Sequence, residues 1–236
     1  MYKRQVQYYV DGKLVHTANK APYYYELDTA ALGGGSHTIY TVASGNQFRR
    51  TNPTYTLNVP GTPAEEKPSG WAQGYVKEAV EAGIVPEELQ GGYTQAATRG
   101  EFCALAVQLY ETATGKTVTE RVKFDDTTDE NVEKAAALGV VSGVAPGKAN
   151  PNGTITREQA AVMLAKLAEV CGKPLSAGES SFADGASISG WAAGAVDQIA
   201  SNGIMSGTGG GNFSPKGRYT REQSITTMLS MFHYVK

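Results

Sequence analysis

The sequence predicts a multi-domain protein, with an all-β segment over residues 1–60 and a mainly α-helical body over residues 69–236. Three observations carry this prediction. Apolar residues recur at every second position before residue 60, and at helical spacing after residue 69. One short motif opens a helix three times in the second part. Residues 61–68, which are rich in proline and charge, are typical of a linker between the two parts.

Alternating apolar residues and turn residues predict the strands of the first part. Val6, Tyr8 and Val10 precede Asp11-Gly12, a pair that favours a type I′ hairpin turn. Further strands are expected at 23–27, at 38–42 after the glycine turn 33–35, and at 55–59.

The repeated motif of the second part has the form of a capping box. Residues 98–101 are Thr-Arg-Gly-Glu, and residues 156–159 and 220–223 are both Thr-Arg-Glu-Gln. The threonine hydroxyl can accept a hydrogen bond from the backbone N–H three residues on, and the Glu or Gln there can bond back. An amphipathic helix precedes each motif and ends at a glycine: Gly83, Gly139 and Gly203. Each unit is therefore expected to be a helix, a glycine-rich loop and a capped helix.

An arginine follows the capping threonine in each motif: Arg99, Arg157 and Arg221. At the first helical position a cation lies at the positive end of the helix dipole, where an acidic side chain is more favourable. Three such arginines at equivalent places indicate helix N-termini that hold an anion with exposed backbone N–H groups and a guanidinium fork. The alternative is a solvated charge or a salt bridge to Asp126 or Asp184.

The three units resemble S-layer homology (SLH) repeats. The family pattern joins Phe-x-Asp, a Trp-Ala helix start, Gly-Ile-x-x-Gly, Phe-x-Pro and Ile-Thr-Arg-Ala-Glu. The third unit matches nearly all of it, with Phe182-Ala183-Asp184, Trp191-Ala192 and Gly203 to Gly207 among its matches. The second unit has Thr127 in place of the Trp, and the first has no Phe-x-Asp. The boundaries we assign are 69–116, 117–173 and 174–236.

The resemblance implies a pseudo-threefold body with three grooves that tethers a surface protein to secondary cell-wall polysaccharide, commonly through an acidic, pyruvylated sugar. The implied polysaccharide-binding residues are Arg99, Arg157, Arg221, Glu101, Trp71, Trp191, Ser142, Gly143, Ser206 and Gly207. Trp71 and Trp191 have an alternative role as core anchors, since a Trp that opens an amphipathic helix usually packs inward. Because the first two units depart from the pattern, the three grooves are expected to differ in affinity.

Residues 1–60 are similar to bacterial immunoglobulin-like modules, which usually begin with two further strands. They therefore predict a truncated, partial immunoglobulin-like sandwich. Residues 1–5 are what a GTG start followed by TAT AAG AGA CAG would encode, which resembles a sequencing adapter. On this hypothesis residues 1–5 are an artefact to be excluded from fold reasoning, and the native protein extends upstream.

Composition bounds the function. A net charge of −2 and a pI near 6.0 argue against nucleic acid as a partner. No apolar run is long enough to span a bilayer, so we expect no membrane insertion. His16, His37 and His233 are scattered without metal-ligand spacing, and we expect neither metal nor cofactor. Cys103 and Cys171 are predicted to be buried free thiols.

The sequence predicts a binding module and not an enzyme, because no nucleophile is paired with a base. It is expected to be secreted and to lie at the bacterial cell wall or S-layer surface. Lateral self-association through upstream regions is a further expected interaction. Two alternatives stay open: the anchor of a surface hydrolase whose catalytic domain lies upstream, and a peptidoglycan-binding module.

Overall fold

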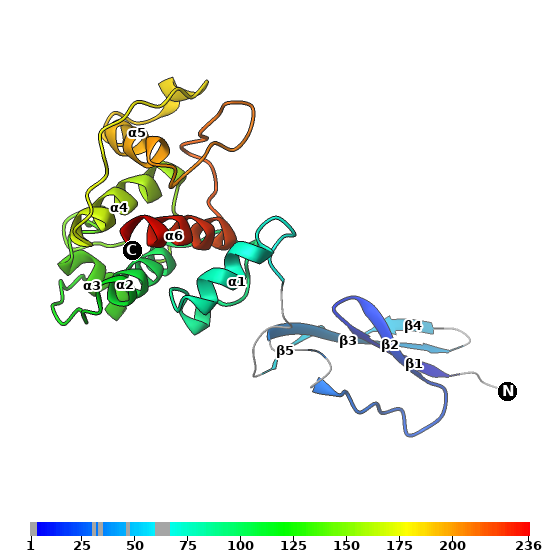
Figure 1. The fold of residues 1–236 in the computed structure, drawn as a ribbon. Coiled ribbons are helices and arrows are strands. Elements are labelled where there is room, and N and C mark those ends of the chain that lie inside the picture. The colour runs from blue at the N-terminus through cyan, green and yellow to red at the C-terminus, as the bar shows by residue number, and fades with distance from the viewer. Residues whose placement is uncertain (1–3, 30–31, 33–34, 46–47, 60–66) are drawn as a thin grey trace. The chain divides into compact units, whose positions relative to one another are not determined.

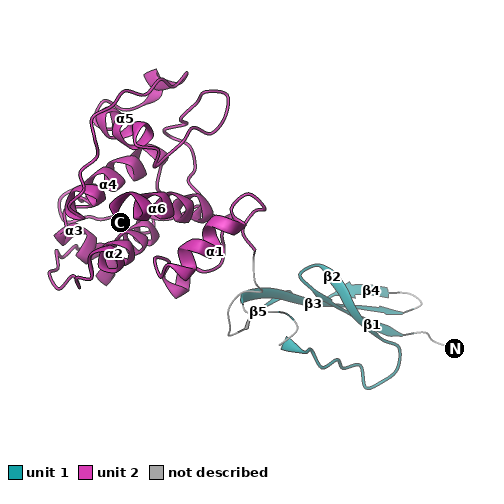
Figure 2. Cartoon of the chain, in the orientation of Figure 1, with its two compact units in different colours: residues 1–66 teal, residues 67–236 magenta. Residues whose placement is uncertain are grey.

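The computed structural model describes residues 4–29, 32, 35–45, 48–59 and 67–236. The chain forms two compact units, Met1–Glu66 and Lys67–Lys236, and each is described by itself (Figures 1 and 2). Residues 1–3 of the predicted artefact, most of the predicted linker and two glycines of the turn 33–35 lie outside the described residues.

The described residues of the N-terminal part, Met1–Glu66, form one antiparallel sheet. Its strands are β1 (Gln5–Val10), β2 (Lys13–Ala18), β3 (Gly35–Gly45), β4 (Phe48–Thr51) and β5 (Tyr55–Val59). The strand order is β2-β1-β3-β4. Strand β4 pairs with residues 42–45 of β3, and β5 pairs with residues 35–39, at the other end of the same strand. Asp11 and Gly12 have φ values of 49° and 76°, the left-handed pair that a type I′ turn needs. The hairpin and the strands at 38–42 and 55–59 are confirmed, and this sheet is the described layer of the immunoglobulin-like module.

The strand expected at 23–27 is wrong, because these residues have no ladder partner and form an irregular segment. Side chains bind it to the first hairpin instead. The Tyr8 hydroxyl donates to the carbonyl of Tyr23 at 2.6 Å, and the Tyr25 ring stacks on His16 with centroids 4.6 Å apart. The alternating tyrosines of this segment thus reflect packing of their side chains on the hairpin, and not pairing of the backbone with a neighbouring strand. Strand β4 was not predicted, since its four residues are too few to show a period.

The helical body, Lys67–Lys236, consists of the three repeated units, and each unit contributes two helices. In chain order these are α1 (Gln73–Glu81) and α2 (Arg99–Thr114), α3 (Glu130–Ala137) and α4 (Arg157–Val170), and α5 (Ala193–Ser201) and α6 (Arg221–Val235). Two short 3-10 helices, η2 (Glu87–Leu89) and η3 (Gly185–Ser187), lie in connecting loops. All three predicted capping boxes are present at Thr98, Thr156 and Thr220. Gly83, Gly139 and Gly203 adopt the positive φ expected where a helix ends.

The three pairs interlock as a ring. The capped helices α2, α4 and α6 contact one another, and their apolar side chains form one core with the first helices. Each first helix packs on the capped helix of the preceding unit: α3 on α2, α5 on α4, and α1 on α6 (Figure 1). The pairing of α1 with α6 joins the last unit to the first. Among the described helices, none combines the length and apolar character that crossing a membrane requires.

Asp126 and Asp184 hold the loops that lead to α4 and α6. The Asp126 carboxylate accepts from the N–H groups of Ala149 and Asn150, both at 2.9 Å, and Asp184 accepts from Phe213 and Ser214 at 2.8 and 2.7 Å. Asn150 and Ser214 have positive φ values of 53° and 58°, so these bonds support a conformation that such residues rarely adopt. The alternative in which these aspartates form salt bridges to the arginines is therefore wrong.

We expect the two aspartates to make stability fall in acid. Hydrogen bonds from backbone N–H groups hold the pKa of Asp126 and Asp184 below the usual 3.8. The stabilisation is therefore complete above the unfolded value and is lost as the pH falls through the lower, folded value. Asp184→Asn should unfold at less urea than the parent near neutral pH, and the gap between the two midpoints should narrow below about pH 4. A gap that stays constant in acid contradicts this assignment.

Both cysteines are free thiols; Cys103 is buried, as predicted, whereas Cys171 is only half-buried. Burial raises the pKa of Cys103 to about 12 and that of Cys171 to about 11. Since the thiolate is the reactive form, alkylation of the native protein should be slow, with Cys171 modified before Cys103. Mass spectrometry of a time course tests the order. After unfolding without reductant, both cysteines should react; a chain that returns no free thiol would contradict the structure.

Candidate functional site: three grooves between the helical units

Two of the repeated arginines connect one unit to the loop of the next. The Arg99 side chain donates from Nε to the Ala149 carbonyl and from Nη2 to the Ser142 carbonyl, both at 3.1 Å. Arg157 does the same with the carbonyls of Phe213 at 2.7 Å and Ser206 at 2.6 Å. Both residues are buried, 8% and 6% exposed. The alternative in which these two arginines are solvated charges is therefore wrong, and the carbonyl partners explain how the charge is tolerated inside.

The remaining nitrogen of these two forks, Nη1, is bonded to no group in the described part of the chain. The Arg157 guanidinium also lies against two aromatic rings, 4.9 Å from the centroid of Phe213 and 5.4 Å from that of Tyr219. Burial lowers the pKa of Arg157 from its ordinary value, but a guanidinium remains charged at neutral pH. Each fork thus keeps a cationic N–H edge that its structural bonds do not use.

Arg221 is arranged differently. Its Nη1 donates to the Gly91 carbonyl and its Nη2 to the Glu101 carboxylate, at 2.6 Å from Oε1. Its Nε is buried and has no partner among the described residues. Glu101, predicted to bind polysaccharide, instead neutralises this arginine and also completes the capping box of α2. The third arginine is therefore paired with an acid, as the salt-bridge alternative holds, although with neither of the two aspartates considered.

The helix N-termini are not open to an anion, so this part of the prediction is wrong. At the start of α2, the N–H groups of Arg99 and Gly100 donate to the carbonyls of Gly153 and Pro151, both at 2.9 Å. Loops of the next unit accept in the same way at α4 and α6: Glu158 donates to Pro215, Arg221 to Gln95, and Glu222 to Tyr93. The groups that a helix usually offers to a ligand are used here to join the units.

One pocket of the helical body, groove A, has a volume of about 550 Å³. It lies between the start of α1, the loop before α6 and one face of α6, and Arg157 reaches it from α4. Its lining is Trp71, Tyr75, Arg157, Gly203, Ile204, Met205, Ser206, Gly207, Thr208, Tyr219, Gln223, Thr226, Thr227 and Ser230. Most of these groups are hydroxyl-bearing, amide or aromatic, which suits a sugar.

Groove B is the equivalent site one unit earlier. It is smaller, about 110 Å³, and its lining is Arg99, Val140, Val141, Ser142, Gln159, Val162, Met163, Lys166 and Trp191. The residues correspond position by position with groove A: an arginine from one unit, the loop and capped helix of the next, and a tryptophan from the unit after it. Lys166 stands where groove A has Ser230, so groove B carries a second cation.

Groove C, about 420 Å³, is lined by Val80, Gly83, Val85, Pro86, Glu87, Glu88, Gln90, Ala104, Gln108 and Asn131. It has no tryptophan, because Thr127 takes that position, and Pro86 to Glu88 replace the Ser-Gly loop. Arg221 is engaged with Glu101 instead. The structure thus brings together the predicted residues of grooves A and B, and gives groove C an acidic lining.

Trp71 and Trp191 are 53% and 61% exposed, so their alternative assignment as core anchors is wrong. Ser142 and Ser206 contribute carbonyls to the arginines. Gly143 and Gly207 are needed for packing of the loop on itself, since a Cβ there would lie 2.9 Å from the Lys148 carbonyl and 2.6 Å from that of Asn212. Only Gly207 also lines a groove.

The sequence analysis missed the polar face of α6: Gln223, Thr226, Thr227 and Ser230. Its signal is present, since polar residues at i, i+3, i+4 and i+7 on an otherwise apolar helix mark one continuous stripe. Tyr75, which also lines groove A, was not among the predicted residues. Within the described residues, no group of His, Cys, Asp and Glu could hold a metal ion.

Comparison with known protein families finds two kinds of module. Residues 124–161 and 181–223 match the S-layer homology domain, and residues 4–40 match a bacterial Ig domain. The matched SLH residues lie in the second and third units. The assignment of residues 69–116 as a further repeat remains a prediction, which rests on the shared capping box and helix pair.

Three relatives illustrate the contexts in which such sequences occur. The chain is 33% identical to an amylopullulanase of Thermoanaerobacterium thermosulfurigenes over 57% of its length, and 30% identical to an endoglucanase of Bacillus sp. (strain KSM-635) over 70%. It is 28% identical to a surface-layer 125 kDa protein of Lysinibacillus sphaericus over 66%. It covers only 7%, 18% and 14% of those proteins. The chain thus carries S-layer homology domains, modules of cell-surface association, together with a bacterial Ig-like domain.

Proposed function

We propose that residues 67–236 anchor the protein non-covalently to the cell wall by binding an acidic, pyruvylated polysaccharide in grooves A and B. One observation carries the proposal: the same set of groups recurs at equivalent positions in both grooves. Each has an arginine with a free Nη1, an exposed tryptophan and a glutamine on the capped helix. Repetition of a costly buried cation beside an exposed aromatic ring is hard to explain by packing alone.

The chemistry of this set suits a sugar that carries a carboxylate. The Nη1 edge can donate charge-assisted hydrogen bonds to the carboxylate oxygens, and a guanidinium already fixed by two carbonyls has lost its rotational freedom before the ligand arrives. The tryptophan supplies an apolar surface for the C–H face of the sugar ring, while its exposed position leaves room for a polymer. Groove A adds neutral donors and acceptors along α6, and groove B adds the charge of Lys166.

Groove C is proposed to contribute little to this binding. Glu87 and Glu88 line it, and the Arg221 charge is offset by Glu101. Like charges near a carboxylate raise the free energy of the complex. On this proposal the three grooves differ in affinity, as expected from the departures of the first and second units.

A second candidate is that this chain is the anchoring part of a surface hydrolase. The names of two relatives, an amylopullulanase and an endoglucanase, favour it, and the chain spans less than a fifth of either one. The same grooves would then attach a catalytic domain to the wall. A peptidoglycan-binding role is the third possibility, and purified walls can separate it from the first two.

The test is co-sedimentation with purified cell walls before and after chemical removal of pyruvyl groups. Removal should abolish most binding, because the carboxylate is the proposed partner of Nη1. Binding to peptidoglycan freed of polysaccharide would overturn the proposal in favour of the third possibility. Unchanged binding after removal of the pyruvyl groups would show that the carboxylate is not what the grooves recognise.

Trp71→Ala and Trp191→Ala should each weaken wall binding by about 10-fold, since loss of an aromatic stacking surface costs about 1–2 kcal/mol. Both residues are exposed, so the melting temperature should stay close to that of the parent. Thr127→Ala is the matched control at the equivalent position of groove C and should leave binding unchanged. Equal effects of all three variants would contradict the proposed difference between the grooves.

The Arg157→Ala variant should be destabilised by about 2–4 kcal/mol, because two buried charge-assisted hydrogen bonds are lost and two carbonyls are left unpaired. Urea unfolding measures the cost. Arg157→Lys should recover only part of it, since an ammonium cannot span both carbonyls and also face the groove. A stability equal to that of the parent would show that the loop does not depend on Arg157.

A further inference from the structure

Two glutamates with no part in the proposed binding are buried at the junctions between units. Glu158 and Glu222, the second residues of α4 and α6, are 2% and 5% exposed. The Glu222 carboxylate accepts from the backbone N–H and the hydroxyl of Ser69, both at 2.8 Å. Glu158 accepts from the same two groups of Ser189, at 3.0 and 3.2 Å. Each carboxylate thus binds both donors of one serine in the next unit around the ring.

These serines begin the turns that carry the groove tryptophans. The Ser69 carbonyl accepts from the N–H groups of Ala72 and Gln73, at 2.7 and 3.2 Å, so the turn that contains Trp71 starts at Ser69. Ser189 starts the turn of Trp191 in the same way. Helices α1 and α5 have no side-chain cap of their own. The glutamate from the neighbouring unit is therefore the group that ties the start of each helix to the body of the protein.

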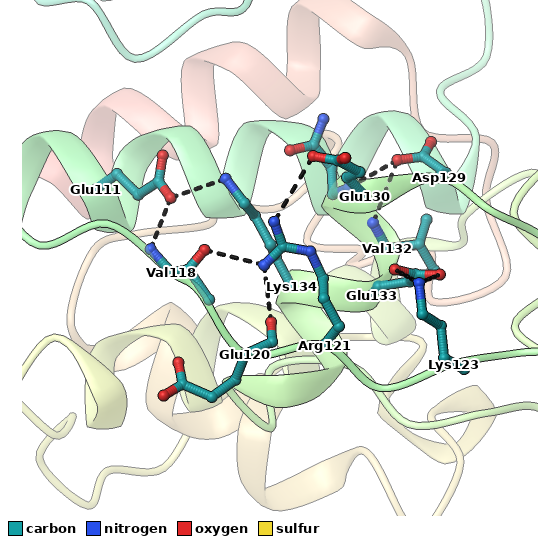
Figure 3. A network of polar contacts seen from close by, with 11 residues as sticks. Glu111, Val118, Glu120, Arg121, Lys123, Asp129, Glu130, Val132, Glu133 and Lys134 are labelled. Carbon is teal, nitrogen blue, oxygen red and sulfur yellow. Dashed lines mark hydrogen bonds and ion pairs between the residues drawn. The ribbon is translucent and has the colours of Figure 1, made fainter.

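The junction between the first and second units lacks both the glutamate and the tryptophan. Gly100 stands at the glutamate position of α2, and Thr127 replaces the tryptophan. Helix α3 is capped instead from within, because Asp129 Oδ1 accepts from the N–H groups of Asn131 at 2.8 Å and Val132 at 3.4 Å (Figure 3). A Cβ at Gly100 would lie 3.7 Å from Asp129 Oδ2. A glutamate at position 100 would therefore bring a second carboxylate close to that of Asp129.

We propose that Glu158 and Glu222 are positioning residues that hold Trp191 and Trp71 as ligand platforms. Each would anchor the peptide two residues before an exposed indole, which otherwise has few contacts to limit its motion. An aromatic ring ordered before binding loses less entropy when a ligand stacks on it. The positioning itself is independent of any ligand, whereas its effect on affinity rests on the proposed function. Lys216 reinforces the first case, since its ammonium contacts Glu158 and lies 6.0 Å from the Trp191 ring centroid.

The chain contains two tryptophans, which allows a ligand-free test. In the Trp191→Phe background the only indole is Trp71, and adding Glu222→Ala should lower its steady-state fluorescence anisotropy and increase quenching by acrylamide. Adding Glu158→Ala to the same background should change neither signal, since Glu158 acts on the other turn. The Trp71→Phe background should give the reverse result, with Glu158→Ala effective and Glu222→Ala silent.

The crossed design separates positioning from general loss of structure. Equal changes from both glutamate variants in one background would mean global loosening and would overturn the proposal, as would no change from either. Should Glu222→Ala fail to fold, Ser69→Ala removes the hydroxyl donor alone and should shift the Trp71 signal in the same direction by a smaller amount. An unchanged Trp71 signal in a folded Ser69→Ala variant would count against the proposal.

The ligand arm uses purified cell walls and the full chain. Glu222→Ala should reduce wall affinity by about 2- to 10-fold, the range expected when one side chain must be ordered on binding. The loss should disappear when Trp71 is already alanine, because the glutamate acts through that ring. A loss that persists in the Trp71→Ala background would show a separate role. If walls do not bind the parent at all, the proposed function fails, while the fluorescence result still decides the positioning.

Discussion

The helical unit depends on hydrogen bonds that run from the start of each capped helix to the loop of the next unit. Backbone N–H groups at the first turns of α2, α4 and α6 donate to loop carbonyls across each junction, and side chains of Arg99 and Arg157 add two bonds each. A helix N-terminus must find partners for these groups, and a loop without regular structure has carbonyls to offer. Because each unit supplies what its neighbour lacks, none is complete alone.

This arrangement gives the arginines a double role. Two nitrogens of each fork hold a loop, and each arginine also lines the groove that the loop helps to form. The N–H edge proposed to bind is thus held in place by the same bonds that stabilise the fold. The arrangement also separates this site from the usual anion site at a helix N-terminus, since here the backbone donors are used within the protein and only the side chain remains for a ligand.

The departures from threefold symmetry lie at two of the three junctions, on either side of the first repeat. Gly100, Glu101 and Thr127 differ from their counterparts, and each difference is compensated locally: Asp129 caps α3, and Glu101 pairs with Arg221. The polar contacts around α3 include the ion pairs of Lys134 with Glu111 at 3.0 Å and of Lys123 with Glu133 at 2.7 Å (Figure 3). The ring is therefore closed at every junction, while only two grooves keep the arginine and tryptophan set.

Local patterns in the sequence were enough to determine the capping boxes, the helix pairs, the hairpin at Asp11-Gly12 and the repetition of Arg99, Arg157 and Arg221. All of these depend on residues within a few positions of one another, so the chain itself encodes them. Tertiary structure alone decided that Trp71 faces solvent, that the helix N-termini are occupied and that Arg221 pairs with Glu101. Those outcomes depend on which unit's loop reaches which helix, and contacts between residues far apart in the chain leave no periodic signal in a single sequence.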